Sequence, residues 1–429
     1  MAFNTTGHLK NTVAKAMFDF LKLNFTSSYF FFAKTSKYGP GAGDTKLNLI
    51  PKKDQMNELH KELLLLYRMD KNTFTLCFDR INWTLNTIHT EYSQDNNEAK
   101  CYVITDEYRV YKCITNNEDS PSLYKPTHTT FDIKSYKDGY KWKFLYELSS
   151  LERRAFLSST KIPISIYPIP NSYIDMVQFN AEPGTLDAVK IINGGSNYAN
   201  TDVVKITGNG TGATGRVIAQ GGILKRIEIT SPGKGYTYAN IEITGKGILA
   251  EVKAVISPFA GHGSDLMKEL NVNSIMINSK TLNGTLDISN IPKRFDYRKI
   301  GLITDYKANK LDSTLISGCW KIRVEDSTNF TVNAQVKLNT ITGIIAYKEI
   351  VLGEHYVYIN ETDVEATSLS ITNKMMTQLN GTIESSTRIV EVIHKPNINK
   401  NFDILYLENL PKNTCVEHEI DILRIVLEF

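Results

Sequence analysis

The stretch that decides the fold lies at residues 101–114, where the sequence is CYVITDEYRVYKCI. Two runs rich in β-branched and aromatic residues, Cys101–Ile104 and Val110–Ile114, flank a polar stretch at Asp106-Glu107. Runs of this composition favour β-strands, and a short polar connection between two of them is typical of a hairpin. We therefore predict an antiparallel β-hairpin here.

The next strand signal follows a predicted turn at Asp138-Gly139, because this dipeptide favours tight turns. Residues Tyr140–Tyr146 then alternate apolar and polar side chains at first, as a strand with one buried face does. Trp142 lies in this run, and Trp83 lies in an earlier one. Both could serve as platforms for sugar rings, but half-buried strands place such residues in a core, and we favour core positions for both.

Helical spacing of apolar residues marks three short stretches. They are Leu9–Phe20, Met56–Leu66 with Asp54 as its predicted N-cap, and Leu266–Leu270. Strand-like segments outnumber these stretches, and two strands close the chain within Phe402–Phe429. We therefore predict a mainly β fold of the α+β class with a few short helices.

A Gly-rich segment between residues 182 and 256 contains two related halves. Ile192–Tyr198 aligns with Thr230–Tyr236, which places Gly195 over Gly233 and Tyr198 over Tyr236. Two copies are too few for a long solenoid, so the segment predicts a small all-β module of two halves. We expect both glycines at turns with positive φ or close backbone approach. We expect both tyrosines to pack as equivalent residues of the two halves.

Breaks at Pro183-Gly184 and Ser257-Pro258 bound this module and divide the chain into a discontinuous β-rich core with two insertions. The predicted core comprises residues 1–181 and 257–306, completed by a C-terminal strand pair in 396–429. The Gly-rich module, 182–256, is the first insertion, and a second β-rich insertion covers 307–395. A module inserted in this way has neighbouring termini and should be separable from its host.

Composition narrows the functional class. The chain has 429 residues, 41% hydrophobic and 22% charged, with a formal net charge of +3, as in ordinary globular proteins. This weak, scattered charge does not favour binding to nucleic acid. The five cysteines form no C-x-x-C pair, so we predict neither a disulfide framework nor a zinc site. We find no signal-peptide pattern and no apolar run near the ~20 residues that span a bilayer, so we expect no membrane insertion.

Two motifs invite the assignment of a chemical site. Gly210–Gly215 matches G-x-G-x-x-G, but the residues after it are β-like, whereas a dinucleotide site needs a helix there to hold the pyrophosphate. His262 stands between Gly261 and Gly263, and we expect it to bond to backbone in a loop rather than to act in catalysis. The other histidines are dispersed. The sequence therefore predicts no catalytic residue, no cofactor and no metal site.

Five segments resemble those of a known family, in the same order along the chain. They are Asp79–Thr84, which contains Trp83; Tyr102–Cys113; Asp138–Tyr146, which contains Gly139, Tyr140 and Trp142; the loop Pro258–Gly263 with Glu269-Leu270 after it; and Ile404–Asn409 with the closing Leu427–Phe429. The family is the baseplate wedge protein of contractile-tailed (myovirus) phages, a dimer between the inner wedge and the peripheral short-tail-fibre apparatus. Leu410 and Glu417–Glu419 depart from the family pattern, so contacts at those positions are not carried over.

The resemblance implies a structural subunit of a phage tail baseplate wedge, without enzyme activity. Such a subunit forms a homodimer, contacts other wedge proteins and takes part in conformational switching on host attachment. The resemblance also implies a place in the virion, after assembly in the host cytoplasm, with the Gly-rich module on the outside of the particle. It implies structural roles for Trp83, the Asp138-Gly139-Tyr140 turn, Trp142 and the Gly261-His262-Gly263 loop.

Two other classes of protein stay open on the sequence. A receptor-binding or tail-fibre protein would grip host surface polysaccharide through the Gly/Tyr module. A virion-associated glycan-degrading enzyme would need two carboxylates roughly 5–10 Å apart in a cleft, which a sequence does not reveal. Fibre proteins usually contain long trimeric repeats, and this sequence has none, so we rank the wedge subunit first.

Overall fold

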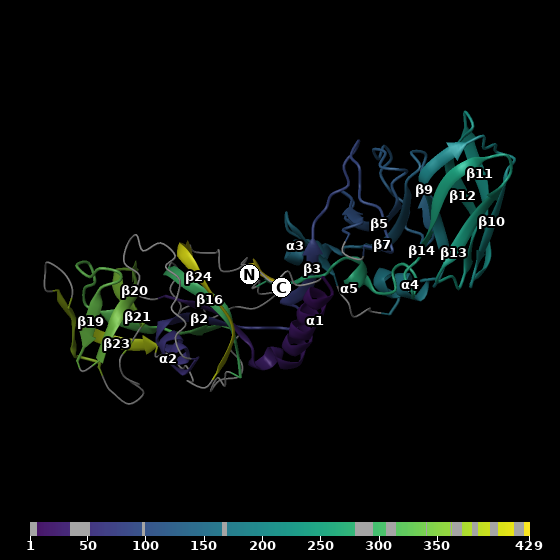
Figure 1. The fold of residues 1–429 in the computed structure, drawn as a ribbon. Helices are drawn as coiled ribbons and strands as arrows, with labels where there is room; N and C mark the ends of the chain where they lie inside the picture. The colour runs from purple at the N-terminus through teal and green to yellow at the C-terminus, as the bar shows by residue number, and fades with distance from the viewer. Residues whose placement is uncertain are drawn as a thin grey trace. The chain divides into compact units, whose positions relative to one another are not determined.

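The computed structural model describes residues 7–34, 52–96, 99–164, 170–278, 295–305, 315–339, 341–360, 362, 371–379, 385–394, 402–415 and 424–429. Within them the fold is mainly β with a few helices, which confirms the predicted class (Figure 1). The chain forms two compact units: Met1–Phe18 with Thr75–Met276 and Val426–Phe429, and Asp19–Phe74 with Ile277–Ile425. The predicted five-part domain map divides the chain differently and stays a prediction.

One antiparallel sheet of the first unit carries the predicted hairpin. Its order is β4-β5-β7-β6, with β4 at Tyr102–Ile104, β5 at Arg109–Thr115, β6 at Ile133–Ser135 and β7 at Lys141–Glu147. Tyr102 lies opposite Lys112, and Ile104 lies opposite Val110, which confirms the hairpin. One face of this hairpin sheet packs into a core around Trp142 and Phe144. Because side chains alternate along a strand, the residues between them point to the other face.

A second sheet has the order β25-β15-β3-β8. Its strands are Arg424–Glu428, Ser274–Asn278, Phe74–Asp79 and Lys161–Ile164. β8 lies at the edge, a position that suits its Pro163, because proline cannot donate to a central ladder. The helices include α1 at Gly7–Asn24 and α5 at Leu266–Glu269, both predicted, as well as α3 at Ser150–Phe156 and α4 at Tyr173–Phe179.

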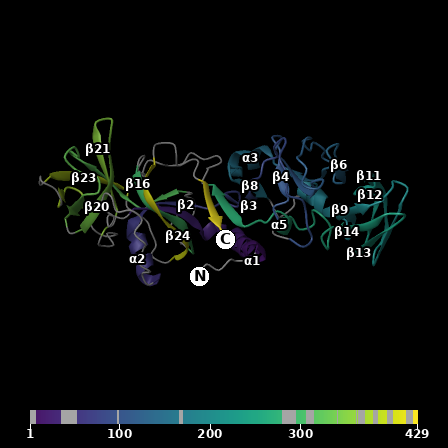
Figure 2. The ribbon, with the colours of Figure 1, turned by 45° about the horizontal axis from the view of Figure 1, so that its top comes forward.

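The Gly-rich segment forms six strands, all within the described residues, that lie close together (Figure 2). They are β9 at Leu186–Ser196, β10 at Val203–Gly208, β11 at Thr211–Gln220, β12 at Ile223–Lys234, β13 at Ala239–Thr244 and β14 at Ile248–Ile256. β14 pairs with β9, and the other four strands form a sheet of order β12-β11-β10-β13. The predicted all-β module is thus confirmed.

The two halves of the module make equivalent contacts with each other, so that each half bonds to the other in the same way. The amide of Tyr198 donates to the carbonyl oxygen of Gly222 at 2.9 Å, and the amide of Tyr236 donates to that of Gly184 at 3.0 Å. These two bonds occupy equivalent places in the two halves. The sequence repeat is therefore a repeat of structure.

The tyrosine hydroxyls and the glycines of the repeat follow the same symmetry within this chain. The hydroxyl of Tyr198 accepts from the amide of Ala250, and that of Tyr236 accepts from Ala213, each at 3.3 Å. Both tyrosines are buried, at 8% and 4% exposed. Gly195 and Gly233 have φ of +57° and +60°. The predictions of positive φ for these glycines and of equivalent packing for the tyrosines are confirmed.

In the second unit, an antiparallel sheet has the order β17-β2-β1-β16-β24. Its strands are Leu315–Ser317, Leu63–Arg68, Tyr29–Ala33, Phe295–Thr304 and Asp403–Cys415. The 3-10 helix η1 at Phe25–Ser27 precedes β1. The aromatic run of β1 is buried throughout, as befits a central strand.

The predicted helix Met56–Leu66 is wrong in its second half. Helix α2 covers Lys52–Glu62, so Asp54 lies inside it rather than at its N-cap, and Leu63–Leu66 belong to β2. All four leucines are fully buried, so both faces of β2 are covered at this point. A short apolar run of this kind fits a buried strand or a buried helix equally, so periodicity could not separate them.

A closed six-stranded barrel completes the second unit. In barrel order, its strands are β18 at Trp320–Val324, β21 at Glu354–Asn360, β20 at Ile341–Val351, β19 at Gln335–Leu338, β22 at Met375–Gln378 and β23 at Ser386–His394. Its interior is aliphatic, with fully buried Ile322, Val336 and Ile359. Closure leaves no free sheet edge along these strands.

The two C-terminal strands form as predicted but do not pair with each other. β24 pairs with β16, with Leu407 opposite Gly301, whereas β25 lies beside β15 in another sheet. Local patterning predicts that a segment is a strand, but ladder partners depend on contacts far along the chain. The prediction of a C-terminal strand pair is therefore corrected.

Replacing Gly233 by alanine should destabilise the protein more than replacing Gly221. Both glycines have φ of +60°, so the left-handed backbone penalises both alanines equally. A Cβ at Gly233 would lie 2.5 Å from the amide nitrogen of Ala213, whereas one at Gly221 meets nothing within 4 Å. We expect thermal unfolding to show an extra loss of about 1–3 kcal/mol for Gly233→Ala. Equal losses would contradict this packing.

Candidate functional site

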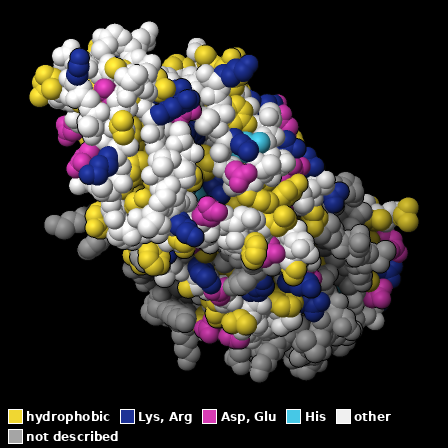
Figure 3. Space-filling model, turned by 90° about the vertical axis from the view of Figure 1, so that its right-hand side faces the viewer, with side chains coloured by type: hydrophobic (Ala, Val, Ile, Leu, Met, Phe, Trp, Pro, Cys, Tyr) yellow, Lys and Arg dark blue, Asp and Glu magenta, His cyan; other side chains and the backbone are white. Residues whose placement is uncertain are grey.

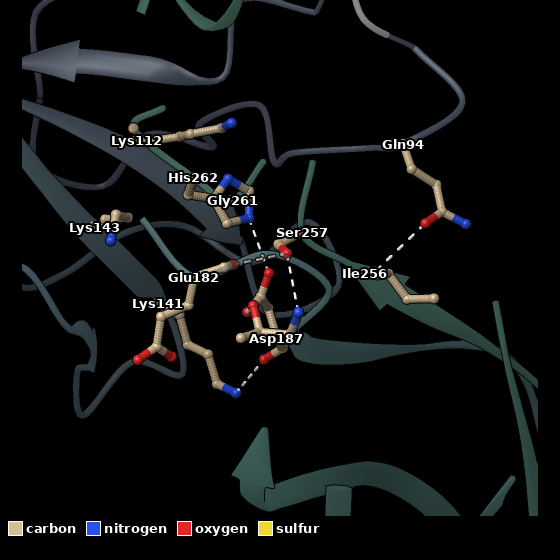
Figure 4. Close-up of polar contacts among 12 residues, drawn as sticks. Gln94, Lys112, Lys141, Lys143, Glu182, Asp187, Ile256, Ser257, Gly261 and His262 are labelled. Carbon is tan, nitrogen blue, oxygen red and sulfur yellow. Dashed lines mark hydrogen bonds and ion pairs between the residues drawn. The ribbon is translucent and has the colours of Figure 1, made fainter. Parts of the chain in front are cut away.

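The hairpin sheet carries lysines on the face opposite its aromatic core. Lys112 on β5 lies directly opposite Lys143 on β7, and Lys141 precedes Lys143 by two residues on the same face. Like charges that face each other across strands are destabilising, so this face needs carboxylates nearby. Asp187 at the start of β9 is one of them, and Figure 4 shows it below the imidazole of His262.

His262 forms a buried hydrogen bond with Asp187. Its Nε2 lies 2.9 Å from Oδ2 of Asp187, and the two side chains are 2% and 1% exposed. The other carboxylate oxygen of Asp187 accepts the hydroxyl of Thr185 at 2.7 Å. The expectation that His262 bonds to backbone is wrong, because its partner is a side chain 75 residues away that a loop pattern cannot indicate.

Glu269 approaches the same imidazole from its other nitrogen. Its Oε2 lies 3.6 Å from Nδ1 of His262 and 2.5 Å from Nζ of Lys112, and its Oε1 accepts the amide of Gly263 at 2.7 Å. Burial alone would raise the pKa of this carboxyl, but Lys112 and His262 outweigh burial and lower the pKa to about 2. We call Lys112, Asp187, His262 and Glu269 the ion cluster.

Two glycines shape the loop that presents His262. Gly261 and Gly263 have φ of +90° and +92°. A Cβ at Gly261 would lie 2.6 Å from the amide nitrogen of Glu182, and one at Gly263 would lie 2.8 Å from Cγ2 of Val177. A side chain at either position therefore meets both backbone strain and a clash. The loop holds the imidazole through its backbone shape.

Both ends of the module meet at the ion cluster, and we call Thr185–Asp187 with Ile256-Ser257 the module root. The amide of Thr185 donates to Oγ of Ser257 at 3.0 Å, and the amide of Ser257 donates to the carbonyl of Thr185 at 2.9 Å. Lys141 donates to the carbonyl of Asp187 at 2.9 Å (Figure 4). The module root is thus bonded to itself, to the loop and to the hairpin sheet.

A cavity of about 310 Å³ opens beside the ion cluster. Its lining is mostly polar and carries both charges, with Lys141, Lys143, Asn180 and His262 beside the carboxylates of Asp132, Glu182 and Asp187. Its apolar lining consists of Phe131, Ile133, Leu186, Ile229 and Pro232. Nε2 of His262 is bonded to Asp187, whereas Nδ1 is buried 3.6 Å from Oε2 of Glu269 and has no hydrogen-bond partner among the described residues.

The residues of the predicted Asp138 turn serve the fold of the hairpin sheet. Oδ2 of Asp138 accepts the amide of Leu123 at 2.8 Å. Gly139 has φ of +85°, and the hydroxyl of Tyr140 donates to the carbonyl of Ser120 at 2.6 Å. The turn is confirmed, and none of these bonds involves the ion cluster.

The two tryptophans differ in burial. Trp142 on β7 is fully buried in the aromatic core, which confirms its predicted place. Trp83 is half-buried against the same core, lies outside the strands, and donates its indole N–H to Oγ of Ser122 at 3.1 Å. The core prediction therefore holds fully for Trp142 and only in part for Trp83.

Two apparent chemical motifs have unsuitable geometry. Gly210–Gly215 runs into β11, which pairs with β12, so the motif is not followed by a helix. In the barrel, Oγ of Ser327 lies 3.1 Å from Nδ1 of His355, but Asp326 faces that same nitrogen at 3.7 Å. A catalytic triad needs the serine and the acid on different ring nitrogens. Within the described residues, no group of three or more His, Cys, Asp and Glu side chains could hold a metal ion.

Sequence reasoning missed the partners of His262. One usable signal was Lys141-Trp142-Lys143, which puts lysines on one face of a strand whose other face is aromatic. A strand buried on both faces needs counter-ions for such lysines. Nothing local pointed to Asp187, because it lies in the inserted module.

Comparison with known proteins assigns no family to the chain. No family model matches it, and no curated protein matches it. Of the helices that the structure describes, none has the length and apolar character needed to cross a membrane. On the face drawn in Figure 3, basic and acidic side chains are interspersed rather than gathered into one basic patch. Fold and site together define a mainly β protein with a buried ion cluster at the root of a pseudo-symmetric β module.

Replacing Glu269 by glutamine should remove a pH-dependent part of the stability. The folded pKa of about 2 lies below the ordinary value of 4.5, so the carboxylate stabilises the fold above pH 4.5 and loses this effect as pH falls toward 2. We expect Glu269→Gln to cost about 3 kcal/mol at pH 7 and much less near pH 2.5, measured by urea unfolding.

The matched control for this measurement is Glu251→Gln, which removes an exposed carboxylate of the module. It should change the free energy of unfolding by well under 1 kcal/mol at both pH values. A Glu269→Gln loss that does not depend on pH would contradict the assigned charge of Glu269.

Proposed function

We propose that this protein is a structural subunit of the baseplate wedge of a contractile-tailed phage. In this role it dimerises, connects wedge components and takes part in the rearrangement that follows host attachment. One observation carries the proposal: segments that resemble the wedge family, although far apart in the sequence, converge around one sheet and one ion cluster.

The convergence involves four of the five resembling segments. The Tyr102–Cys113 hairpin pairs through β5 with β7 of the Asp138–Tyr146 segment. The loop segment joins them through the 2.5 Å ion pair of Glu269 with Lys112. Trp83 joins the hairpin through its amide, which donates to the carbonyl of Ile104 at 2.9 Å. Residues that match a family pattern and also contact one another support a shared architecture better than separate matches do.

Exposed apolar side chains in the first unit supply surface for assembly. On α4, Tyr173, Met176 and Phe179 are 42%, 42% and 88% exposed. Apolar side chains gathered on one element favour contact with another protein, and aromatic residues and methionine are enriched in such interfaces. A scaffold that changes arrangement needs interfaces with two available packings, and patches of this kind suit that use.

The alternative is a receptor-binding protein that recognises host surface polysaccharide. The cavity beside the module root favours it, because its lining combines lysines with Phe131. The position of the chain in the particle separates the two functions. Antibody against the chain should label the baseplate of virions if it is a wedge subunit, whereas labelling at fibre tips would favour the alternative.

In solution we expect the full chain to sediment as a homodimer, and we expect a trimmed variant to do the same. In the trimmed variant, an Asn-Gly turn joins Lys190 directly to Lys253. Lys190 and Lys253 lie opposite each other in the β9–β14 ladder, and a two-residue turn closes such a pair. It removes residues 191–252 and keeps the module root and the ion cluster.

Sedimentation equilibrium at tens of micromolar measures both species. A monomeric full chain would contradict the proposed dimer. A folded but monomeric trimmed variant would place the dimer contact in the module, against the expectation that the module is a separable insertion.

A further inference from the structure

Helix α1 exposes a line of apolar side chains along one face. α1 is one unbroken helix of 18 residues, so the places of its side chains around the axis follow from helical geometry alone. Residues three or four positions apart lie on the same face. Five apolar residues follow this spacing and are exposed, and we call them the α1 stripe: Leu9, Val13, Ala16, Phe20 and Leu23. Leu9 and Leu23 are 48% and 83% exposed.

The opposite face of α1 holds the helix to the rest of the first unit. Asn11, Ala14 and Phe18 are buried on that face. Nδ2 of Asn11 donates to the carbonyl oxygens of Met267 at 3.0 Å and Val272 at 2.6 Å. Folding of the chain thus uses one face of α1 and leaves the α1 stripe exposed.

The spacing of the α1 stripe indicates what covers it. Its members are separated by four, three, four and three residues, an average of 3.5. Apolar residues at this interval form the narrow seam along which one helix packs against another. A helix that lies in a membrane surface buries a wider apolar face, whereas Thr12 and Asp19 border the stripe on one side and Lys10 on the other. The stripe therefore fits an α-helix.

We propose that the α1 stripe is the surface through which two copies of this chain meet, with α1 of one copy packed along α1 of the other. In a two-fold dimer the same surface of both copies forms the contact, so it must be complementary to itself. The α1 stripe meets this condition, because the small Ala16 lies at its centre and larger apolar residues lie on both sides. The two helices approach most closely where alanine meets alanine, and the larger side chains fill the space toward the ends.

Two features favour α1 as the dimer contact. The α1 stripe contains no charged side chain, so two copies bring no like charges together at its centre. α1 is already formed and anchored in the single chain, so association does not have to supply the free energy of helix nucleation, which makes short isolated helices unstable. Helix α4 also exposes apolar residues, but its seven residues give only about two turns. The inference rests on the proposed function, which supplies the dimer, and it adds the contact surface.

Sedimentation equilibrium of the full chain tests this contact with the double variant Leu9→Glu/Val13→Glu. The variant brings like charges of the two copies together, and we expect the dissociation constant of the dimer to rise at least tenfold. Acidic residues near the N-terminus of a helix are favourable, so α1 should persist. The matched control is Phe179→Glu on α4, which replaces a side chain that is 88% exposed and should leave the dissociation constant unchanged.

A cross-link tests the geometry directly. With Ala16→Cys, oxidised glutathione should join two copies covalently, because the two thiols lie opposite each other at the centre of the contact. Each disulfide formed between the copies reduces one glutathione disulfide to two thiols. Lys15→Cys places a thiol beside the stripe and should give far less covalent dimer, and the wild-type chain should give none.

Three outcomes would overturn the proposal. An unchanged dimer in Leu9→Glu/Val13→Glu would place the contact on another surface and leave the proposed dimer standing. A monomeric wild-type chain would contradict both the contact and the dimer, while labelling of virions tests the wedge role separately. Binding of the wild-type chain to phosphatidylglycerol vesicles that the double variant loses, with its dimer retained, would assign the stripe to a lipid surface. Circular dichroism checks folding, and Leu23→Lys, with the same expected loss, replaces a double variant that does not fold.

Discussion

A buried imidazole between two carboxylates fixes how the Gly-rich module meets the hairpin sheet. His262 pairs with Asp187 from the module and faces Glu269, which in turn holds Lys112 of the sheet. Removing one member of a buried ionic group leaves an uncompensated charge, and this cost exceeds the net stability that the intact group provides. The ion cluster therefore makes the position of the module root sensitive to each of its members.

The module itself depends on backbone shapes that glycine provides, and its two halves differ where their surroundings differ. In the alignment of the two halves, Thr230 stands in the place of Ile192 and Thr185 in the place of Ile223. Ile192 and Ile223 are 56% and 43% exposed. Thr185, by contrast, is buried and bonds to Ser257 and Asp187 in the module root, so the two pseudo-symmetric ends differ.

The sequence predicts four features of the fold: its many strands, the hairpin, the turn at Gly139 and the module of two halves. They are predictable because alternation of apolar and polar residues, turn residues and internal repetition are local properties of a sequence. The ion cluster was not, since His262 and Asp187 are 75 residues apart and meet only after the module folds. The helix prediction at Leu63–Leu66 failed for another reason. A strand that is buried on both faces shows no alternation of apolar and polar residues. Long-range pairing of β24 and β25 likewise lay beyond local patterns.

The coupling free energy between His262 and Asp187 tests the ion cluster most directly. Urea unfolding of wild type, His262→Gln, Asp187→Asn and the double variant at pH 7 gives this quantity. Each single change should cost about 3–5 kcal/mol because it leaves a buried group unpaired. The double change should cost less than the sum by at least about 1 kcal/mol, as coupled neighbours do. Additive losses would show that the two residues act independently and would contradict the account.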